Sequence, residues 1–532
     1  MAGGANSRSD YKFGTTPEPS QAIQGARAGG PSWHAREKAA NVFVPLRSCA
    51  AIASVRSPQC SDFRTTMSID ALLAGPLRVV NLGLAGFARD LERRGVAVLD
   101  VDWSPPPVLD GAVQAALRRL TDDPRVDIAN AEAVRRLAAG DPVLLDVRPA
   151  GEVVPGLLDR MILHAGPPIP YARMCGPMRG AIAGAIVLEG WASDLVSAEA
   201  LAASGGVQFA PNHHHNAVGP MTGLITRSMP VMVVENRAFG NRAYCTLNEG
   251  LGKVMRFGGN DASVLDRLRW IAATLGPALG AALRAEGGLA LKPLIARGLA
   301  MGDEMHQRNV ACTSLFIRQM APALAKTGAD ASVFSFMGAN DQFFLNVAMA
   351  MGKALADPAA EVAHATVVSC LSRNGVEFGV RLGGTGARWF TAPCEMPKGL
   401  YFPGFTEADA NPDMGDSAIV ETVGLGGFAM AAAPAVAGFV GAGGVAEALA
   451  ATREMYEITL ARSVDWKIAN LDFAGVPLGI DARRVVATGI APTINTGIAH
   501  RKPGIGQVGA GVVRAPLECF RQAVLAAAEA LS

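Results

Sequence analysis

The first ordered pattern of apolar and polar positions along the chain begins near residue 77. Leu77–Leu82 is typical of a buried strand, the glycine turn Gly83–Gly86 follows it, and amphipathic helical spacing continues to Arg94. A second apolar run, Val96–Trp103, completes a strand, helix, strand pattern. We therefore predict a Rossmann-like βαβ unit within residues 67–125. Its turn would suit a phosphate, but it lacks the first glycine of the full dinucleotide motif, which favours a purely structural unit.

Helical spacing dominates the next part of the chain, and beyond Gly206 polar clusters are set between apolar segments. The helical stretches are Gly111–Leu120, Ala131–Ala139 and Met178–Leu188. We expect a mainly helical segment at residues 126–205, an α/β portion with polar clusters at 206–335 and a Gly-rich α/β portion at 336–532. The expected fold class is α/β, α+β in part: a Rossmann-like N-terminal unit, a helical segment and a large Gly-rich mixed α/β C-terminal region.

Residues 1–66 show no such periodicity. Ser, Gly, Pro and Arg are mixed there, and the single apolar stretch, Val42–Val55, is interrupted by Arg47. A signal peptide needs an uninterrupted apolar core. We therefore interpret this segment as a disordered tail, or as the result of a start assigned too early, with Met67 as the true start.

One uncharged run, Thr422–Ala446, is long enough to cross a bilayer. It consists mainly of Gly and Ala with few large apolar residues, and its flanks are as acidic as they are basic. Close-packed helices buried inside the protein explain this composition better than a transmembrane helix does. We therefore expect no membrane span.

The charge balance argues against a protein that works through a global electrostatic field. The 48 Lys and Arg residues nearly equal the 47 Asp and Glu residues, so we expect neither a nucleic acid nor a membrane as a partner. Any anion site must therefore be local. The eight cysteines lie far apart without a Cys-x-x-Cys pair, which favours free thiols and a cytoplasmic protein.

Two segments resemble parts of a rhodanese domain. Pro142–Pro149 resembles its opening, and Cys175–Arg179 resembles its reactive-thiolate loop. However, the arginine stands one position too close to the cysteine, and the residues before Cys175 lack the apolar strand that should present the loop. We therefore predict that Cys175 is a buried, unreactive, structural thiol.

Three consecutive histidines, His213, His214 and His215, follow a short predicted strand at Val207–Ala210. Consecutive side chains point in different directions on any regular element, so the three cannot jointly ligate one metal without an irregular loop. We predict no metal site here. One imidazole would serve as a proton carrier or would polarise a carbonyl. Turn and capping roles for all three histidines are the alternative.

A denser polar cluster occupies Gly302–Asn309. If it opens a helix, Glu304 and Arg308 share one face. Glu, His, Arg and Asn within six residues exceed what helix capping requires, although an ordinary exposed helix start is the alternative. We therefore predict catalytic roles for Glu304 and His306 and substrate-binding roles for Arg308 and Asn309.

The C-terminal half brings guanidinium and amide groups beside flexible glycines. Backbone N–H groups in glycine turns, joined by Arg or Lys, form anion-binding nests. We predict a catalytic role for His500 and substrate-binding roles for Asn216, Arg373, Asn374, Arg388, Asn495, Thr496 and Arg501. Two Asn-Asp pairs, Asn260-Asp261 and Asn340-Asp341, are typical of helix starts and indicate nothing further.

Six motifs, in order along the chain, resemble those of one known family. They are His164–Ile169, Met174–Gly180, Asn212–Met221, Gly302–Asn309, Asn374–Gly379 and Lys467–Asp472. On these motifs the chain from about Leu77 to its end is identified as a member of the YlbE/AllG family, long described as a domain of unknown function and associated with oxamate carbamoyltransferase. The resemblance does not reach residues 1–66.

The resemblance implies a subunit of a heteromeric complex with an FdrA-type subunit that looks like an acyl-CoA synthetase, with or without a third subunit. The implied reaction belongs to allantoin and purine-nitrogen breakdown. It moves a carbamoyl group between oxalurate and phosphate, yielding oxamate and carbamoyl phosphate. No cofactor is expected, while a need for Mg²⁺ and self-association stay open. Two other functions stay open: a non-catalytic assembly subunit, and a hydrolase acting on an amide or ureido substrate.

Such a transfer requires anion donors, a proton carrier and an orienting carboxylate within about 3 Å of the reacting atoms. No single segment supplies all three. We therefore expect at least two of the segments His213–Asn216, Glu304–Asn309 and Asn495–Arg501 to line one pocket.

Overall fold

The computed structural model describes residues 78–82, 85–101, 107–441 and 443–531. The tail predicted at residues 1–66 lies outside these ranges. The chain divides into two compact units, residues 1–103 and 104–532.

The first unit contains the predicted βαβ pattern. Strand β1 (Arg78–Leu82) pairs in parallel with β2 (Ala97–Val101), and helix α3 (Ala85–Arg93) connects them. The predicted strand, helix, strand order is therefore confirmed. Gly83 of the predicted glycine turn lies outside the described residues.

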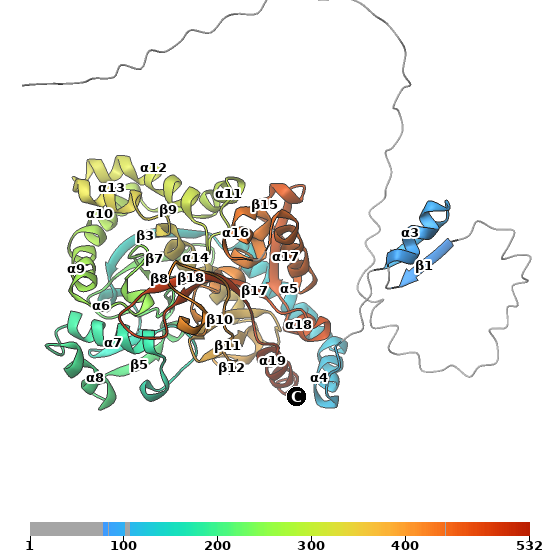
Figure 1. The fold of residues 1–532 in the computed structure, drawn as a ribbon, viewed down its shortest axis with the longest axis horizontal. Helices are drawn as coiled ribbons and strands as arrows, with labels where there is room; N and C mark the ends of the chain where they lie inside the picture. The colour runs from blue at the N-terminus through green and yellow to red at the C-terminus, as the bar shows by residue number, and fades with distance from the viewer. Residues whose placement is uncertain (1–77, 83–84, 102–106, 442, 532) are drawn as a thin grey trace, which may run out of the picture. The chain divides into compact units, whose positions relative to one another are not determined.

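The second unit is built around one almost completely buried helix, α14 (Phe343–Ala360), which packs across a five-stranded sheet and against α5 (Pro124–Ala139) (Figure 1). Its sequence is apolar on nearly every side, which is typical of a helix without a solvent-facing stripe. The sheet has the order β6-β8-β7-β3-β9. The bounds are β6 Ala217–Val218, β8 Asn241–Thr246, β7 Pro230–Asn236, β3 Pro142–Pro149 and β9 Leu289–Ala290.

Smaller sheets carry most of the polar segments of the second unit. A four-stranded antiparallel sheet has the order β12-β11-β10-β14, and a three-stranded one has the order β13-β18-β17. Two further pairs are β15-β16, antiparallel, and β4-β5, parallel. The bounds are β4 Met161–His164, β5 Gln208–Pro211, β10 Val368–Asn374, β11 Glu377–Leu382, β12 Phe390–Pro393, β13 Lys398–Tyr401, β14 Met414–Gly415, β15 Thr459–Ile468, β16 Ala474–Ile480, β17 Thr493–Ala499 and β18 Gln507–Arg514. The α/β fold class is thus confirmed.

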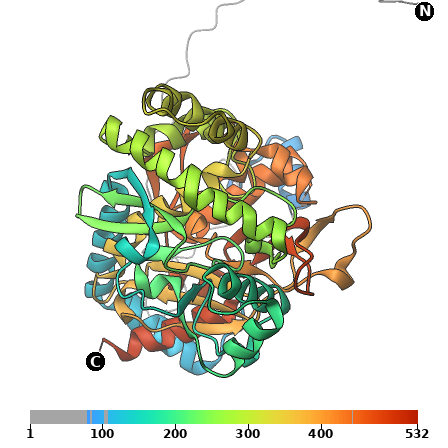
Figure 2. The same cartoon turned by 90° about the vertical axis from the view of Figure 1, so that its left-hand side faces the viewer.

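The two ends of the second unit pack against each other. Helix α4 (Gly111–Asp122), which the sequence pattern grouped with the first unit, places its buried Val113, Ala116 and Leu120 in one apolar cluster with the C-terminal helix α19 (Leu517–Glu529). Figure 2 shows the red α19 beside the blue α4. This apolar contact explains why α4 belongs to the second unit.

The uncharged run at Thr422–Ala446 does not form one long helix. Short elements divide it: α15 (Ile419–Thr422), η7 (Gly426–Ala432), α16 (Pro434–Phe439) and the start of α17 (Val445–Glu457). All residues from Thr422 to Ala433 are buried in the protein. Throughout the described part of the chain, every helix is too short or too polar to cross a bilayer.

The remaining helices surround these sheets, with α11, α12 and α13 along one side in Figure 1. Their bounds are α6 Ala150–Val153, η1 Tyr171–Arg173, α7 Gly176–Leu188, α8 Leu195–Ala203, η2 Asn212–His215, η3 Met255–Phe257, α9 Ala262–Trp270, the π-helix η4 Ile271–Leu275, α10 Gly276–Glu286, α11 Lys292–Ala300, α12 Val310–Lys326, α13 Ala331–Gly338, η5 Gly383–Thr385, η6 Glu407–Asp409, η8 Ala469–Leu471 and α18 Ala482–Thr488.

Candidate functional site

The polar cluster Gly302–Asn309 is a turn and not the start of a helix, the alternative that the sequence left open. Met305 adopts a left-handed conformation with φ 73°, and α12 begins only at Val310. The Asp303 carboxylate accepts a hydrogen bond from the Cys312 backbone N at 2.8 Å and so satisfies a free N–H of the first turn of α12. Asp303 therefore holds the turn against the helix, and the other polar side chains are free to face inward.

Two buried carboxylates organise this turn. Glu304 accepts backbone hydrogen bonds from His306 and Gln307, and its Oε1 also accepts one from Asn495 Nδ2 at 3.0 Å. The His306 imidazole bonds through Nδ1 to Glu421 on α15, 2.7 Å from Oε1. The second and third predicted segments therefore meet in a network of Glu304, His306, Glu421 and Asn495.

Glu421 also binds the edge of strand β17. Its Oε1 accepts hydrogen bonds from the backbone N–H groups of Asn495, at 3.2 Å, and Gly427, at 2.9 Å. A Cβ on Gly426 would stand 2.1 Å from the same oxygen, and this residue has φ 56°. Gly426 therefore has to be a glycine for the carboxylate to reach both the strand and His306.

Beside this network lies a small cavity. His306 and Gln307 line it from the second predicted segment, and Gly497 lines it from the third. Its other polar lining residues are Arg256, Gln342, Ser417 and Gln507. Within the described residues, nothing bonds His306 Nε2, so this ring nitrogen is free for a ligand in the cavity.

Arg256 on η3 is the main cavity residue that the sequence reasoning missed. Its side chain is only 7% exposed, one Nη atom donates to the Gly250 carbonyl at 2.7 Å, and Nε has no partner. Among the described residues, no Asp or Glu lies within ion-pair distance of the guanidinium, but the charge of Glu249 attracts it. Burial outweighs this attraction and lowers the pKa of Arg256 to about 10. A buried cation with an unpaired donor is suited to bind an anion. Its signal in the sequence was an isolated charge within the otherwise apolar stretch Val254–Phe257.

The histidine segment does not line this cavity. His213 is buried, with Nε2 3.5 Å from Asp416 Oδ1, and burial lowers its pKa well below the ordinary value. His214 accepts a hydrogen bond from the Trp389 indole at 2.9 Å, and His215 bonds the Pro155 carbonyl at 2.8 Å. These contacts are those of the turn and capping alternative. Asn216 ends η2 in a left-handed conformation.

Asp416 is the centre of a separate buried polar cluster. Its carboxylate accepts hydrogen bonds from the backbone N–H groups of Gly166 and Gly219 and from the side chains of Asn212 and Ser372. Burial raises its pKa despite these donors. The cluster ties the loops around His213 to strand β10.

Arg373 and Thr496 form part of a third buried group. Arg373 Nε lies 2.6 Å from Asp413 Oδ2, and Thr496 Oγ1 donates to Asp413 Oδ1 at 2.7 Å. Both Arg373 and Asp413 are buried, so the guanidinium is already neutralised and is not available to a substrate. Thr496 follows Asn495 on β17, and consecutive strand residues face opposite sides. The two neighbours therefore contact different polar groups.

The remaining predicted substrate-binding residues, and the predicted catalytic His500, lie outside the cavity lining. Asn374 bonds the Pro167 carbonyl, Arg308 bonds Asp303, and Asn309 bonds the His306 carbonyl. His500 accepts a hydrogen bond from Lys502 N, Arg501 is exposed, and the Arg388 guanidinium lies over the Phe390 ring.

The rhodanese-like features take no part in this site. Pro142–Pro149 is an interior strand of the five-stranded sheet, and Cys175 precedes α7 with its Sγ 3.6 Å from the Asn374 carbonyl. Burial raises the pKa of the Cys175 thiol, which disfavours the reactive thiolate. Across the described ranges, no three His, Cys, Asp or Glu side chains gather as a metal site would require.

The buried Glu304 predicts a specific pH dependence of stability. Burial raises its pKa from 4.5 to about 7, so the folded protein keeps a proton that the unfolded chain has lost. Its stabilising contribution is therefore present at low pH and is lost as the pH rises from about 4.5 to 7. Between pH 5 and pH 8, wild type should lose up to about 3 kcal/mol of unfolding free energy relative to Glu304→Gln, measured by urea denaturation.

The exposed Glu407 provides the control for this measurement. The unfolding free energy of Glu407→Gln should change between pH 5 and pH 8 by the same amount as that of wild type. If the unfolding free energies of Glu304→Gln and wild type changed equally between pH 5 and pH 8, the raised pKa of Glu304 would be contradicted.

Comparison with known proteins gives consistent matches. A family model for the oxamate carbamoyltransferase subunit AllG matches residues 207–417. The oxamate carbamoyltransferase subunit AllG of Escherichia coli (strain K12) is 52% identical over 409 residues, covering 76% of this chain and 98% of the relative. The uncharacterized protein YahG of the same strain is 44% identical over 462 residues, covering 86% of this chain and 98% of YahG.

A solved structure also matches. The crystal structure of a conserved protein of unknown function from Enterococcus faecalis V583 superposes with a TM-score of 0.75 at 44% identity. It covers 76% of this chain and 98% of its own chain.

Proposed function

This chain belongs to the AllG family, and on that premise we propose that it is a subunit of an oxamate carbamoyltransferase that moves a carbamoyl group between oxalurate and phosphate. The observation that best supports a reaction site in this chain is the cavity in which His306, held by Glu421, lies with the buried Arg256. An imidazole and an unpaired cation are what a reaction between two small anions needs.

In the proposed reaction a phosphate oxygen attacks the carbamoyl carbon of oxalurate. The bond from that carbon to the amide nitrogen breaks, and the leaving oxamate nitrogen takes up one proton. We assign the proton transfer to His306 Nε2, because Glu421 bonds Nδ1 and fixes the orientation of the ring. In the reverse direction, His306 Nε2 removes a proton from the oxamate amide as its nitrogen attacks carbamoyl phosphate.

Arg256 is the proposed anion-binding group. Arg256 lines the cavity, and the charge of its guanidinium suits phosphate or the oxalurate carboxylate. The amide side chains of Gln307, Gln342 and Gln507 line the same cavity and add donors and acceptors for a carbamoyl group.

The relative's name contains the word subunit, and we propose that this chain also works in a heteromeric complex. The proposed partner is an FdrA-type subunit, with or without a third subunit. The six described cysteines form no disulfide, which fits the proposed cytoplasmic location. We also propose a role in allantoin breakdown.

Assays of the purified chain, alone and co-purified with the products of neighbouring genes, test this function. Incubated with oxalurate and phosphate, the complex should release oxamate and carbamoyl phosphate in equal amounts. Oxamate release without carbamoyl phosphate would favour the amide hydrolase instead. An active complex that tolerates loss of His306 would favour the assembly subunit.

Replacing Arg256 should selectively weaken anion binding. Loss of a charge-assisted hydrogen bond costs about 1.5–3 kcal/mol, so the phosphate Kd of Arg256→Gln should rise about 10- to 100-fold by isothermal titration calorimetry. Arg256→Lys keeps the charge, so its phosphate Kd should lie between those of wild type and Arg256→Gln. Arg269→Gln removes an exposed arginine that does not line this cavity and should bind phosphate like wild type. Equal phosphate affinity in Arg256→Gln and wild type would remove Arg256 from the site.

A further inference from the structure

Ser417 is a buried serine that lines the same cavity as His306 and Arg256, the reaction cavity. The residue is only 2% exposed, and among the described residues no group hydrogen-bonds its hydroxyl. A buried hydroxyl nearly always has a hydrogen-bond partner, because leaving it unpaired costs free energy. The partner of the Ser417 hydroxyl is therefore expected among the molecules that enter the cavity.

Two fixed carboxylates hold Ser417 in place. Asp416, directly before it, accepts hydrogen bonds from four surrounding groups. Glu421, four residues later, bonds both the edge of β17 and His306. The Ile419 N–H donates to the Asp416 carbonyl at 2.9 Å and closes the turn between the two carboxylates. A donor that is held in this way needs little reorganisation to act on a reacting group.

The amide side chains of the cavity are less suited to this task than Ser417. Gln342 Nε2 already donates to the Gln307 carbonyl, and Gln507 Nε2 donates to the Gly509 carbonyl at 3.2 Å. The Gln307 side chain is only half-buried, and a long side chain of this kind loses more rotamer entropy when it is fixed. Among the polar side chains that line the cavity, Ser417 therefore combines a free neutral donor with a fixed position.

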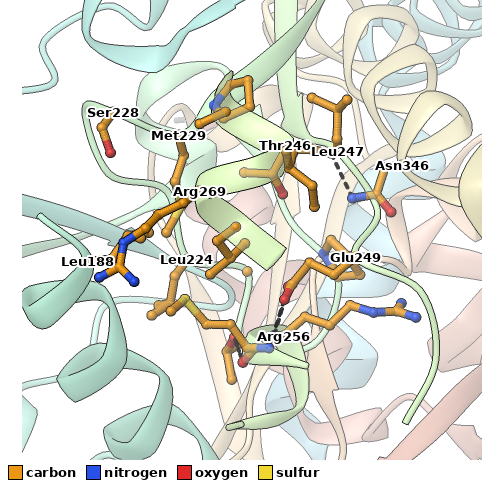
Figure 3. A pocket seen from close by; sticks show the side chains of 18 residues that line it. Leu188, Leu224, Ser228, Met229, Thr246, Leu247, Glu249, Arg256, Arg269 and Asn346 are labelled. Carbon is orange, nitrogen blue, oxygen red and sulfur yellow. Dashed lines mark hydrogen bonds between the residues drawn. The ribbon is translucent and has the colours of Figure 1, made fainter. Parts of the chain in front are cut away.

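The charged donor of the cavity has a different task. Figure 3 shows the Arg256 guanidinium turned away from Leu188 and Leu224, which line a neighbouring apolar pocket. Its charge suits a phosphate or a carboxylate, which is an anion before the reaction begins. A carbonyl oxygen, in contrast, gains negative charge only in the transition state. A neutral hydroxyl can stabilise that charge without binding the substrate more tightly.

We propose that Ser417 is the oxyanion donor of the carbamoyl transfer, an inference that rests on the proposed function. Attack by a phosphate oxygen makes the carbamoyl carbon tetrahedral and places negative charge on the carbamoyl oxygen, and the Ser417 O–H donates to that oxygen. The carbonyl re-forms as the bond to the oxamate nitrogen breaks and His306 supplies the proton to the nitrogen. Ser417 keeps its own proton throughout. No hydrogen bond joins Ser417 to His306, as a nucleophilic serine would require.

Turnover of the co-purified complex with Ser417→Ala tests the proposal. Loss of one oxyanion donor lowers kcat by about 10²–10³-fold, and we expect a loss of that size. The phosphate Kd measured by calorimetry should keep its wild-type value, because Arg256 is unchanged. Ser417→Cys nearly keeps the size of the side chain, but a thiol is a weak donor, so its kcat should stay as low as that of Ser417→Ala. Ser369→Ala removes a buried hydroxyl that does not line the cavity and should leave turnover unchanged.

Three outcomes would overturn the assignment of Ser417 alone. A folded Ser417→Ala complex could keep more than a tenth of wild-type kcat, or Ser417→Cys could recover wild-type kcat. Mass spectrometry after acid quenching could also find a carbamoyl group on Ser417, which would make it the nucleophile. In all three cases the wild-type complex still forms carbamoyl phosphate, so the transferase function stands. A wild-type complex that formed none would end the proposed function and this inference together.

Discussion

His306→Ala should lower the turnover of the assembled enzyme by about 10²–10⁴-fold, because general acid–base catalysis by one imidazole contributes an acceleration of that size. The expected loss is in kcat more than in the KM for phosphate, since Arg256 still binds the anion. His306 is buried and bonds Glu421, so the variant also needs a thermal unfolding curve to show that it is folded. Turnover is measured as carbamoyl phosphate formed from oxalurate and phosphate.

Two companion variants separate proton transfer from packing. Glu421→Gln keeps the size of the side chain but removes the charge that holds His306, and it should shift the pH profile of kcat as well as lower it. His364→Asn replaces a half-buried histidine with a positive φ that does not line the cavity, and it should leave turnover unchanged. If a folded His306→Ala enzyme kept more than a tenth of wild-type kcat, His306 would not be the proton carrier.

Arg373→Met should strongly destabilise the folded protein. The guanidinium and the Asp413 carboxylate form a fully buried pair, and the arginine also donates to the Gly415 carbonyl at 2.7 Å. Removing one partner leaves a buried, uncompensated carboxylate, which costs about 3–5 kcal/mol. Urea unfolding followed by tryptophan fluorescence measures the loss.

The double variant Arg373→Met/Asp413→Asn provides the control. It removes the uncompensated charge, so part of the lost stability should return although a further bond is broken. A single variant that lost less than about 1 kcal/mol, or a double variant with purely additive losses, would show that the pair is not energetically coupled.

Periodicity predicted the elements that have a strong local signal. Gly111–Leu120 and Met178–Leu188 are helices, and Val207–Ala210 lies on the strand β5, within one residue of its bounds. At Gly302–Asn309 the sequence left a helix start open as an alternative, because the spacing of Glu304 and Arg308 fits a helical face. The carboxylates of Glu304 and Asp303 instead accept hydrogen bonds from the backbone N–H groups of Gln307 and Cys312, and these bonds hold the segment as a turn before α12.

The site was predictable in part. Residue chemistry singled out His306, Glu304 and Asn495, which do lie together. Glu421 was missed because it stands directly before an uncharged run, where a single carboxylate carries no periodic signal. Arg373 was misinterpreted as a substrate ligand because its buried partner Asp413 lies 40 residues away, and the pairing follows only from the fold.

Strand β17 carries Asn495 and Thr496 on opposite faces, toward the His306 network and the Arg373 pair respectively. Insertion or deletion of one residue before Asn495 would exchange these two faces along the whole strand. An insertion would bring the Asn495 amide to Asp413, and a deletion would bring the Thr496 hydroxyl to Glu304. In either case both native contacts are lost, so the reaction network and the structural ion pair would fail together. This strand should consequently tolerate side-chain replacement far better than any change in its length, and related chains should differ in length in the surrounding turns.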